Sequence, residues 1–129
     1  TKQGYPRYNL PKPKFLSLTY PVIDLSLKKG VTRANCLGEN CSEEEVKKYS
    51  VHTNVDENYP ETYLWQGRND QCISFENSVI MDKALTENNV KHKYVVYDDT
   101  CHGFGAGKGT CTEGWIDDML KFFNENNKE

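Results

Sequence analysis

Apolar residues along this chain form three short stretches, separated by longer and more polar segments. The first stretch reads FLSLTYPVI, and its apolar, β-prone residues predict a buried strand over residues 14–20. Pro21 should lie at the end of that strand, because proline cannot donate a hydrogen bond to a central ladder. Two further strands are predicted at 62–66, before Gly67, and at 94–97, where β-branched and aromatic residues gather.

Helical spacing of apolar residues predicts one helix after each of the last two strands. In SFENSVIMDKALTENN these positions are Val79, Ile80, Ala84 and Leu85, before a terminating pair, Asn88 and Asn89. In GWIDDMLKFFNEN one face gathers Trp115, Ile116, Met119, Leu120 and Phe123. A shorter helix is predicted at about 43–49, because Ser42 and Glu45 have the spacing of a capping box.

The order of these elements predicts an α/β fold in which parallel strands are joined by crossovers. Three strands are few for a parallel sheet that must be covered on both faces, so the chain should be one end of a larger sheet. We divide this partial domain into a connector (1–13), a strand region (14–23), an insert with a short helix (24–58) and a strand–helix–strand–helix unit (59–129). Core candidates within the strands are Tyr63, Trp65 and Val95.

Composition and charge exclude several classes of function. The chain has 129 residues and a formal net charge of −3, without a long basic block, so binding to nucleic acid or to an anionic membrane has no electrostatic support. The longest apolar run is only a few residues, which is too short for a spanning helix.

The cysteines are odd in number, so one of them must be unpaired in a monomer. They are Cys36, Cys41, Cys72, Cys101 and Cys111. The chain has no CxxC pair, so their spacing matches no zinc pattern. We expect reduced structural thiols, with a Cys36–Cys41 or Cys101–Cys111 disulfide as the alternative. The cellular location stays open between the cytoplasm, which is slightly favoured, and secretion.

Two polar residues follow neighbouring predicted strands. Asp70 follows the second strand and His102 follows the third, 32 residues later in the chain. Functional groups of open α/β sheets gather beyond the carboxyl ends of the strands, so these two side chains should lie close together. A carboxylate beside an imidazole fixes its tautomer and stabilises the imidazolium, as a general base requires.

The glycine-rich segment HGFGAGKGT does not fit a nucleotide site. A P-loop would need glycine at position 102 and Ser or Thr at 109, where the chain has His102 and Gly109. The segment also fails as a dinucleotide fingerprint, because that motif belongs in a first strand–helix turn with an acidic residue downstream. The segment should therefore be a pliable loop that carries His102 towards the last helix.

The residues next to His102 include possible metal ligands and a possible nucleophilic thiol. The neighbours Asp98, Asp99, Cys101 and His102 cannot all point inward from one tight turn, and we expect neither a metal nor another cofactor. A nucleophilic cysteine needs a histidine within hydrogen-bond reach. Cys101 is adjacent to His102, where side chains diverge, and Cys72 follows the acid on its own loop, so both should be structural.

An ordered set of motifs resembles the C-terminal part of an α/β-hydrolase, closest to the esterase and acetyl-xylan-esterase-like branch that is related to prolyl-oligopeptidase-type domains. The motifs are YPVI at 20–23, LGEN and SEEEVKKYS in the insert, PETYLWQG leading into GRND at 67–70, and HGFG at 102–105. The resemblance covers roughly residues 13–125 and implies that Asp70 is the acid and His102 the base of a Ser-His-Asp triad.

The sequence departs from the family in one respect, because it contains neither a G-x-S-x-G elbow nor an oxyanion-hole motif. The resemblance therefore implies a partner that supplies the serine, namely a missing N-terminal portion of the same fold, and a small ester as substrate. The chain alone should be inactive as a serine hydrolase. Two alternatives remain open: a peptidase of the prolyl-oligopeptidase type, and a non-catalytic remnant or assembly module that self-associates through an exposed strand edge.

Overall fold

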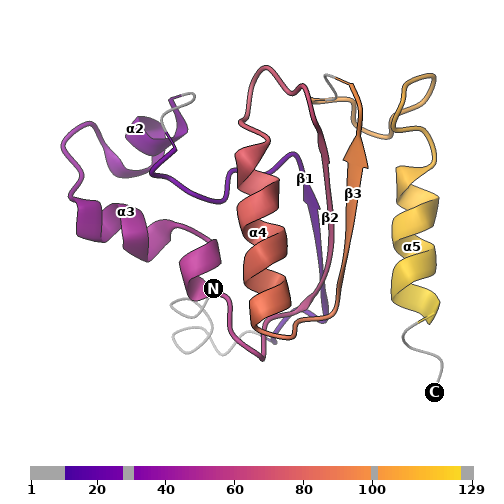
Figure 1. Cartoon of the computed structure of the whole chain (residues 1–129), viewed down its shortest axis with the longest axis horizontal. Helices are drawn as coiled ribbons and strands as arrows, with labels where there is room; N and C mark the ends of the chain where they lie inside the picture. Colours follow the sequence, from indigo (N-terminus) through magenta and orange to yellow (C-terminus); the bar gives the residue numbers. More distant parts are fainter. Residues whose placement is uncertain (1–10, 28–30, 100–101, 126–129) are drawn as a thin grey trace.

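A computed structural model describes residues 11–27, 31–99 and 102–125 of the chain. Within this part, three strands form one parallel sheet in the order β1-β2-β3. The strands are β1 (Phe15–Thr19), β2 (Glu61–Gly67) and β3 (His92–Tyr97), and they point the same way in Figure 1. The predicted α/β fold with three parallel strands is confirmed, and each strand lies within two residues of its predicted position.

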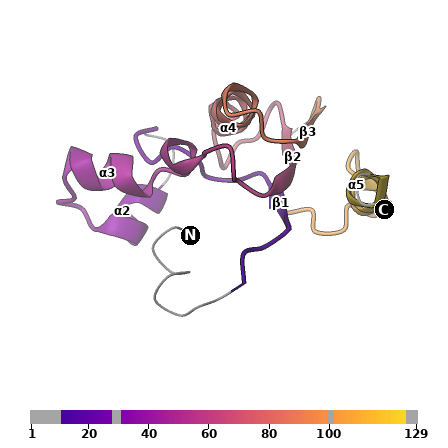
Figure 2. The same ribbon diagram turned by 90° about the horizontal axis from the view of Figure 1, so that it is seen from below.

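The middle strand β2 is buried on both faces, and its alternation divides the interior into two clusters. Leu64 points to one face, whereas Tyr63 and Trp65 point to the other, because successive side chains of a strand alternate. Helix α4 (Glu76–Glu87) covers the first face and helix α5 (Trp115–Glu125) the second. Seen from below, the two helices lie on opposite sides of the sheet (Figure 2).

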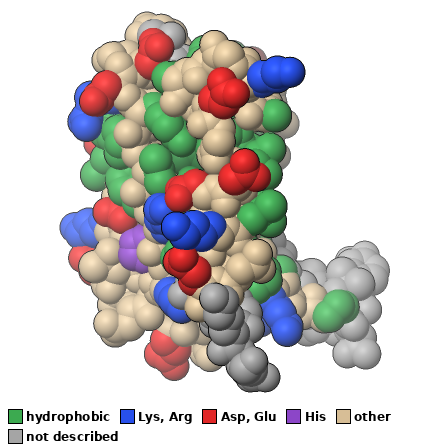
Figure 3. Space-filling view, turned by 90° about the vertical axis from the view of Figure 1, so that its right-hand side faces the viewer, with side chains coloured by type: hydrophobic (Ala, Val, Ile, Leu, Met, Phe, Trp, Pro, Cys, Tyr) green, Lys and Arg blue, Asp and Glu red, His purple; other side chains and the backbone are tan. Residues whose placement is uncertain are grey.

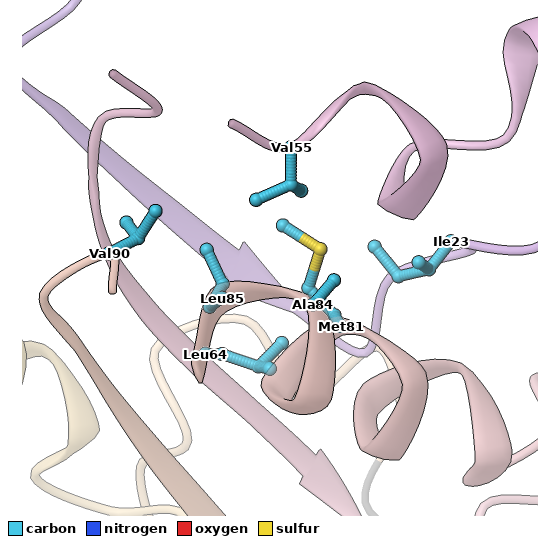
Figure 4. Packing of buried hydrophobic residues seen from close by; sticks show 7 residues of the cluster. All are labelled: Ile23, Val55, Leu64, Met81, Ala84, Leu85 and Val90. Atoms are coloured by element: carbon cyan, nitrogen blue, oxygen red, sulfur yellow. The ribbon is translucent and has the colours of Figure 1, made fainter. Parts of the chain in front are cut away.

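The first cluster packs α4 against the sheet and the insert. Its buried members, shown in Figure 4, are Ile23, Val55, Leu64, Met81, Ala84, Leu85 and Val90. Val79, which the helical pattern placed with the apolar positions of this helix, is 45% exposed. The inward face of α4 instead includes the polar residues Asn77 and Ser78, which make hydrogen bonds to neighbouring segments.

The second cluster packs α5 against the opposite face of the sheet. Phe123 is its buried helical member, with Trp115, Met119 and Phe122 packed at its edge. The predicted apolar face of α5 is only partly correct, because Ile116 and Leu120 are 36% and 49% exposed. On the side of the molecule where α5 lies, apolar side chains are interspersed with acidic and basic ones (Figure 3).

The insert forms two short helices and one 3-10 turn beside the sheet. The predicted short helix is confirmed as α3 (Glu43–Tyr49), with both hydrogen bonds of the capping box between Ser42 and Glu45. Helix α2 (Thr32–Leu37) was not predicted, and it begins without a side-chain cap. The turn η1 (His52–Asn54) connects α3 to the chain that enters β2. None of the helices in the described residues is long and apolar enough to cross a membrane.

Candidate active site

Asp70 lies in the turn between β2 and α4, where the chain folds around its carboxylate. Its side chain is fully buried. The oxygen Oδ1 accepts hydrogen bonds from the backbone N–H groups of Cys72 at 2.8 Å and Ile73 at 2.9 Å. The amide of Gln66, which is buried in β2, donates to Oδ2 at 3.3 Å and to the Ile73 carbonyl at 3.1 Å. These donors hold the carboxylate in a single orientation.

The same contacts determine the protonation state of Asp70. Burial raises the pKa of a carboxyl group, because the charged form loses water. Here the hydrogen bonds from Ile73, His102, Cys72 and Gln66 outweigh burial, and the pKa of Asp70 is lowered below its ordinary value. The carboxylate is therefore ionised at neutral pH and able to orient a neighbouring imidazole.

His102 lies after β3, and the structure brings it to Asp70 as the sequence predicts. Its Nδ1 lies 2.9 Å from Oδ2 of Asp70, and its side chain is 28% exposed. An ionised carboxylate only accepts hydrogen bonds, so Nδ1 carries the proton in this pair. In the neutral ring, Nε2 is then free of a proton and can accept one.

The aromatic ring of Tyr20 packs against the imidazole, a contact that the sequence did not reveal. The two ring centroids are 4.6 Å apart, and Tyr20 also meets Trp65 edge-on at 5.1 Å. Tyr20 has a φ of 41°, an uncommon value for a residue other than glycine. Its backbone N–H donates to the carbonyl of Trp65, which anchors the residue at the end of β1. The available signal was its position, because it follows its strand as Asp70 and His102 follow theirs.

The thiol of Cys72 also lies close to this pair. One ligand atom each from Asp70, Cys72 and His102 lie within 4.8 Å of one another. Cys72 is exposed and reduced. The sequence predicts a structural role for Cys72. Spacing alone does not show that the turn after Asp70 brings this thiol close to His102.

The conformation of the loop from His102 to α5 depends on a glycine with a positive φ and on hydrogen bonds. Gly107 has a φ of 74°, and a Cβ at this position would collide with Thr112, which is fully buried. The indole N–H of Trp115 donates to the carbonyl of Gly105 at 2.8 Å, which ties the loop to α5. The predicted pliable loop is therefore an ordered connection over the residues that the structure describes.

Cys111 in this loop is disulfide-bonded, so the prediction of reduced thiols is wrong for this residue. Cys36 and Cys41 are free, and the alternative disulfide between them is wrong as well. Cys101, which the other alternative pairs with Cys111 and for which the sequence predicts a structural role, lies outside the described residues.

Asp98, a further acidic residue near His102 in the sequence, lies at the surface, and another histidine lies at the far end of the sheet. Asp98 forms an exposed ion pair with Arg68 at 2.9 Å. His92 lies at the start of β3, where its Nε2 is 3.0 Å from Asp82. Two Asp–His pairs are thus found among the described residues, and the Asp70–His102 pair lies where the strands end.

Three parallel strands with helices on both faces, and an acid and a histidine after successive strands, define the class of the α/β-hydrolases. The model of the prolyl oligopeptidase family matches residues 15–129, and the chain belongs to this family.

Comparison with individual proteins agrees with this assignment. The chain is 28% identical over 105 residues to endo-1,4-beta-xylanase B of Butyrivibrio fibrisolvens, and this match covers 81% of the chain and 16% of the xylanase. The structure of an acetyl ester-xyloside bifunctional hydrolase from Caldicellulosiruptor lactoaceticus is similar with a TM-score of 0.81 and 27% identity, over 88% of this chain and 43% of that one.

A carboxylesterase from Lactobacillus plantarum shares the fold, with a TM-score of 0.71 and 16% identity over 98% of this chain and 50% of its own. The chain therefore spans half or less of the length of these relatives.

Proposed function

We propose that this chain contributes the acid and the base of a serine ester hydrolase. The observation that carries the proposal is the 2.9 Å contact between His102 Nδ1 and Asp70 Oδ2 at the carboxyl ends of neighbouring parallel strands. The nucleophilic serine belongs to a portion of the fold outside the given sequence, which contains no G-x-S-x-G elbow.

The proposed reaction is acyl transfer in two steps. The serine attacks the ester carbonyl while Nε2 of His102 takes its proton, and Asp70 stabilises the imidazolium that forms. The imidazolium then protonates the departing alcohol, which leaves an acyl-enzyme. Water attacks this intermediate with His102 again as the base, which releases the acid and restores the serine.

The preceding portion of the fold would join the sheet at β1. This strand lies at the edge of the three-stranded sheet, with β2 as its neighbour. An edge strand offers unpaired backbone groups for a further strand, and in the chain alone the same edge would favour self-association.

Short-chain esters, and acetylated sugars in particular, are the proposed substrates. The Caldicellulosiruptor relative is described as an acetyl ester-xyloside hydrolase, and the Lactobacillus structure as a carboxylesterase. The family name favours a second candidate, a peptidase, which would use the same chemistry on an amide. Rates with p-nitrophenyl acetate and with a prolyl p-nitroanilide separate the two, and we expect the ester to be cleaved faster.

Fluorophosphonate labelling tests the assignment, because the probe reacts with a serine that a base activates. The chain alone should remain unlabelled. The chain produced together with its preceding coding region should be labelled at one serine outside this sequence, and His102→Ala should abolish this labelling.

His92→Ala is the matched control, because it removes a histidine from the Asp82 pair at the opposite end of β3. Labelling should survive this change. Labelling of a serine within this chain, or an equal loss in both variants, would contradict the assignment. A complete protein that is neither labelled nor active would favour the non-catalytic assembly module.

A further inference from the structure

The Asp70–His102 pair and the neighbouring thiol together form a set of three possible metal ligands. One oxygen, one nitrogen and one sulfur atom from Asp70, Cys72 and His102 lie within 4.8 Å of one another. Ligands around a tetrahedral Zn²⁺ lie roughly 3.5 Å apart, given metal–ligand bonds of about 2.0–2.3 Å. Closing the set around a cation therefore requires side-chain shifts of about 1 Å, to which rotation of the exposed Cys72 can contribute. Binding also releases the proton of the Cys72 thiol and any proton on the His102 nitrogen that becomes the ligand.

The ligand types select the cation. Thiolate and imidazole favour Zn²⁺ and similar ions, whereas Mg²⁺ and Ca²⁺ prefer sets made of oxygen atoms. Three protein ligands leave a fourth position for water, and the exposed thiol provides a path of entry from solvent. The buried carboxylate is already oriented by the N–H groups of Cys72 and Ile73 and by the Gln66 amide, which is the outer support that metal sites need.

We propose that Asp70, Cys72 and His102 form a binding site for Zn²⁺ between the β2–α4 and β3–α5 loops. This set differs from the neighbours Asp98, Asp99, Cys101 and His102, which all belong to one short segment of the sequence. Its ligands come from two loops that the parallel strands bring together, and Asp70 and Cys72 are two positions apart on the same turn.

Occupation of the site would regulate the proposed hydrolase. A cation that binds His102 takes the imidazole out of proton transfer, so the metal would inhibit acyl transfer reversibly. This consequence rests on the proposed function, whereas metal binding itself does not.

Spectroscopic titration of this chain with Co²⁺, followed by displacement with Zn²⁺, tests the site. We expect one Co²⁺ per chain, with a thiolate-to-cobalt charge-transfer band that Zn²⁺ removes. Cys72→Ser should abolish the band. His102→Ala and Asp70→Asn should each weaken binding by about 10-fold or more, since even loss of an outer-shell partner costs ~10–100-fold.

Cys41→Ser and Cys36→Ser are matched controls, because both residues are also free thiols but lie in the insert. Binding should be unchanged in these variants, and circular dichroism checks that every variant is folded. Absence of Co²⁺ and Zn²⁺ binding, or a band that persists in Cys72→Ser, would overturn the site. Neither result would bear on the hydrolase proposal, which is tested by labelling of the complete protein.

Discussion

At the scale of single residues, the geometry of His102 depends on a hydrogen bond to Asp70 and on a tilted ring contact with Tyr20. Asp70 fixes Nδ1, and Tyr20 packs on the imidazole with a centroid separation of 4.6 Å. A catalytic base that moves by about 1 Å can lose on the order of 100-fold in rate. Tyr20 is therefore a positioning residue for the proposed reaction.

Replacement of Tyr20 tests this role in the complete enzyme. Tyr20→Ala removes the ring, and we expect kcat to fall by about 10–100-fold while KM changes little. Tyr20→Phe keeps the ring contact and should retain most of the activity. Steady-state kinetics measures these effects, and thermal unfolding checks that both variants are folded. Wild-type kcat in Tyr20→Ala, or an equal loss of kcat in Tyr20→Phe and Tyr20→Ala, would refute the role.

Asp70 and His102 could be predicted from the sequence because strand order predicts that they lie close together and because GRND and HGFG resemble family motifs. Each comes directly after a strand, and parallel strands end at the same edge of a sheet. The contacts of Tyr20 and Cys72 could not be predicted in this way, because they depend on the path of a turn and on an unusual φ of Tyr20. The sequence predicts the disulfide of Cys111 only as an alternative, because an odd number of cysteines does not show which thiols are paired.

At the scale of elements, a polar cluster ties α5 to the sheet. Asp118 of α5 accepts hydrogen bonds from the Tyr63 hydroxyl of β2 and the Lys93 ammonium of β3, both at 2.7 Å. Lys93 and then Tyr63 lower the pKa of Asp118. Burial, followed by the bond to Asp118, raises the pKa of Tyr63, so the phenol keeps its proton and remains the donor.

This cluster predicts a pH dependence of stability. A carboxyl group whose pKa is lowered in the folded state adds stability that is fully present above the unfolded value of about 3.9. That stability is lost as the pH falls through the lower, folded pKa. Asp118 is partly exposed, so we expect a contribution of at most about 1 kcal/mol.

Asp118→Asn should therefore reduce the free energy of unfolding at pH 7 and have a smaller effect in acid. Urea denaturation of both proteins between neutral and acidic pH measures the difference. A constant difference at every pH would contradict the role of the charge.

The loop between β3 and α5 has one position at which glycine is required for two reasons. Gly107→Ala would impose a left-handed φ on alanine and place its Cβ against Thr112. We expect a loss of about 1–3 kcal/mol in the free energy of unfolding, measured by thermal denaturation.

Gly109→Ala is the matched control, since Gly109 has a φ of 73° but no atom within 4 Å of its Cβ position. It should cost only the backbone strain. Equal losses in the two variants would show that the contact with Thr112 is unimportant.

Local sequence signals predicted most elements but not their orientation. The capping box located α3 because both of its hydrogen bonds lie within four residues. Helix α2 has no side-chain cap, so its start left no local signal. The rotation of α5 is set by packing of Phe123 and its neighbours against Tyr63 and Trp65, and an apolar pattern alone cannot show that Ile116 and Leu120 remain exposed.

At the scale of the whole molecule, the parallel sheet places an acid–base pair at the carboxyl ends of β2 and β3. It leaves β1 as an outermost strand, with β2 as its neighbour. The chain belongs to the prolyl oligopeptidase family and spans 43% and 50% of two similar hydrolase structures. The proposed hydrolase therefore needs two things from the remaining fold, a serine and a neighbouring strand. The central claim is that Asp70 and His102 then act as one unit.

A double-mutant cycle in the complete enzyme tests this claim most directly. The measurement is kcat/KM for p-nitrophenyl acetate in Asp70→Asn, His102→Ala and the double variant. We expect each single change to lower kcat/KM by on the order of 10³-fold or more, and the double variant to be no worse than His102→Ala, because residues that act as a unit are not additive. Losses that multiply in the double variant, or activity that survives His102→Ala, would contradict the account.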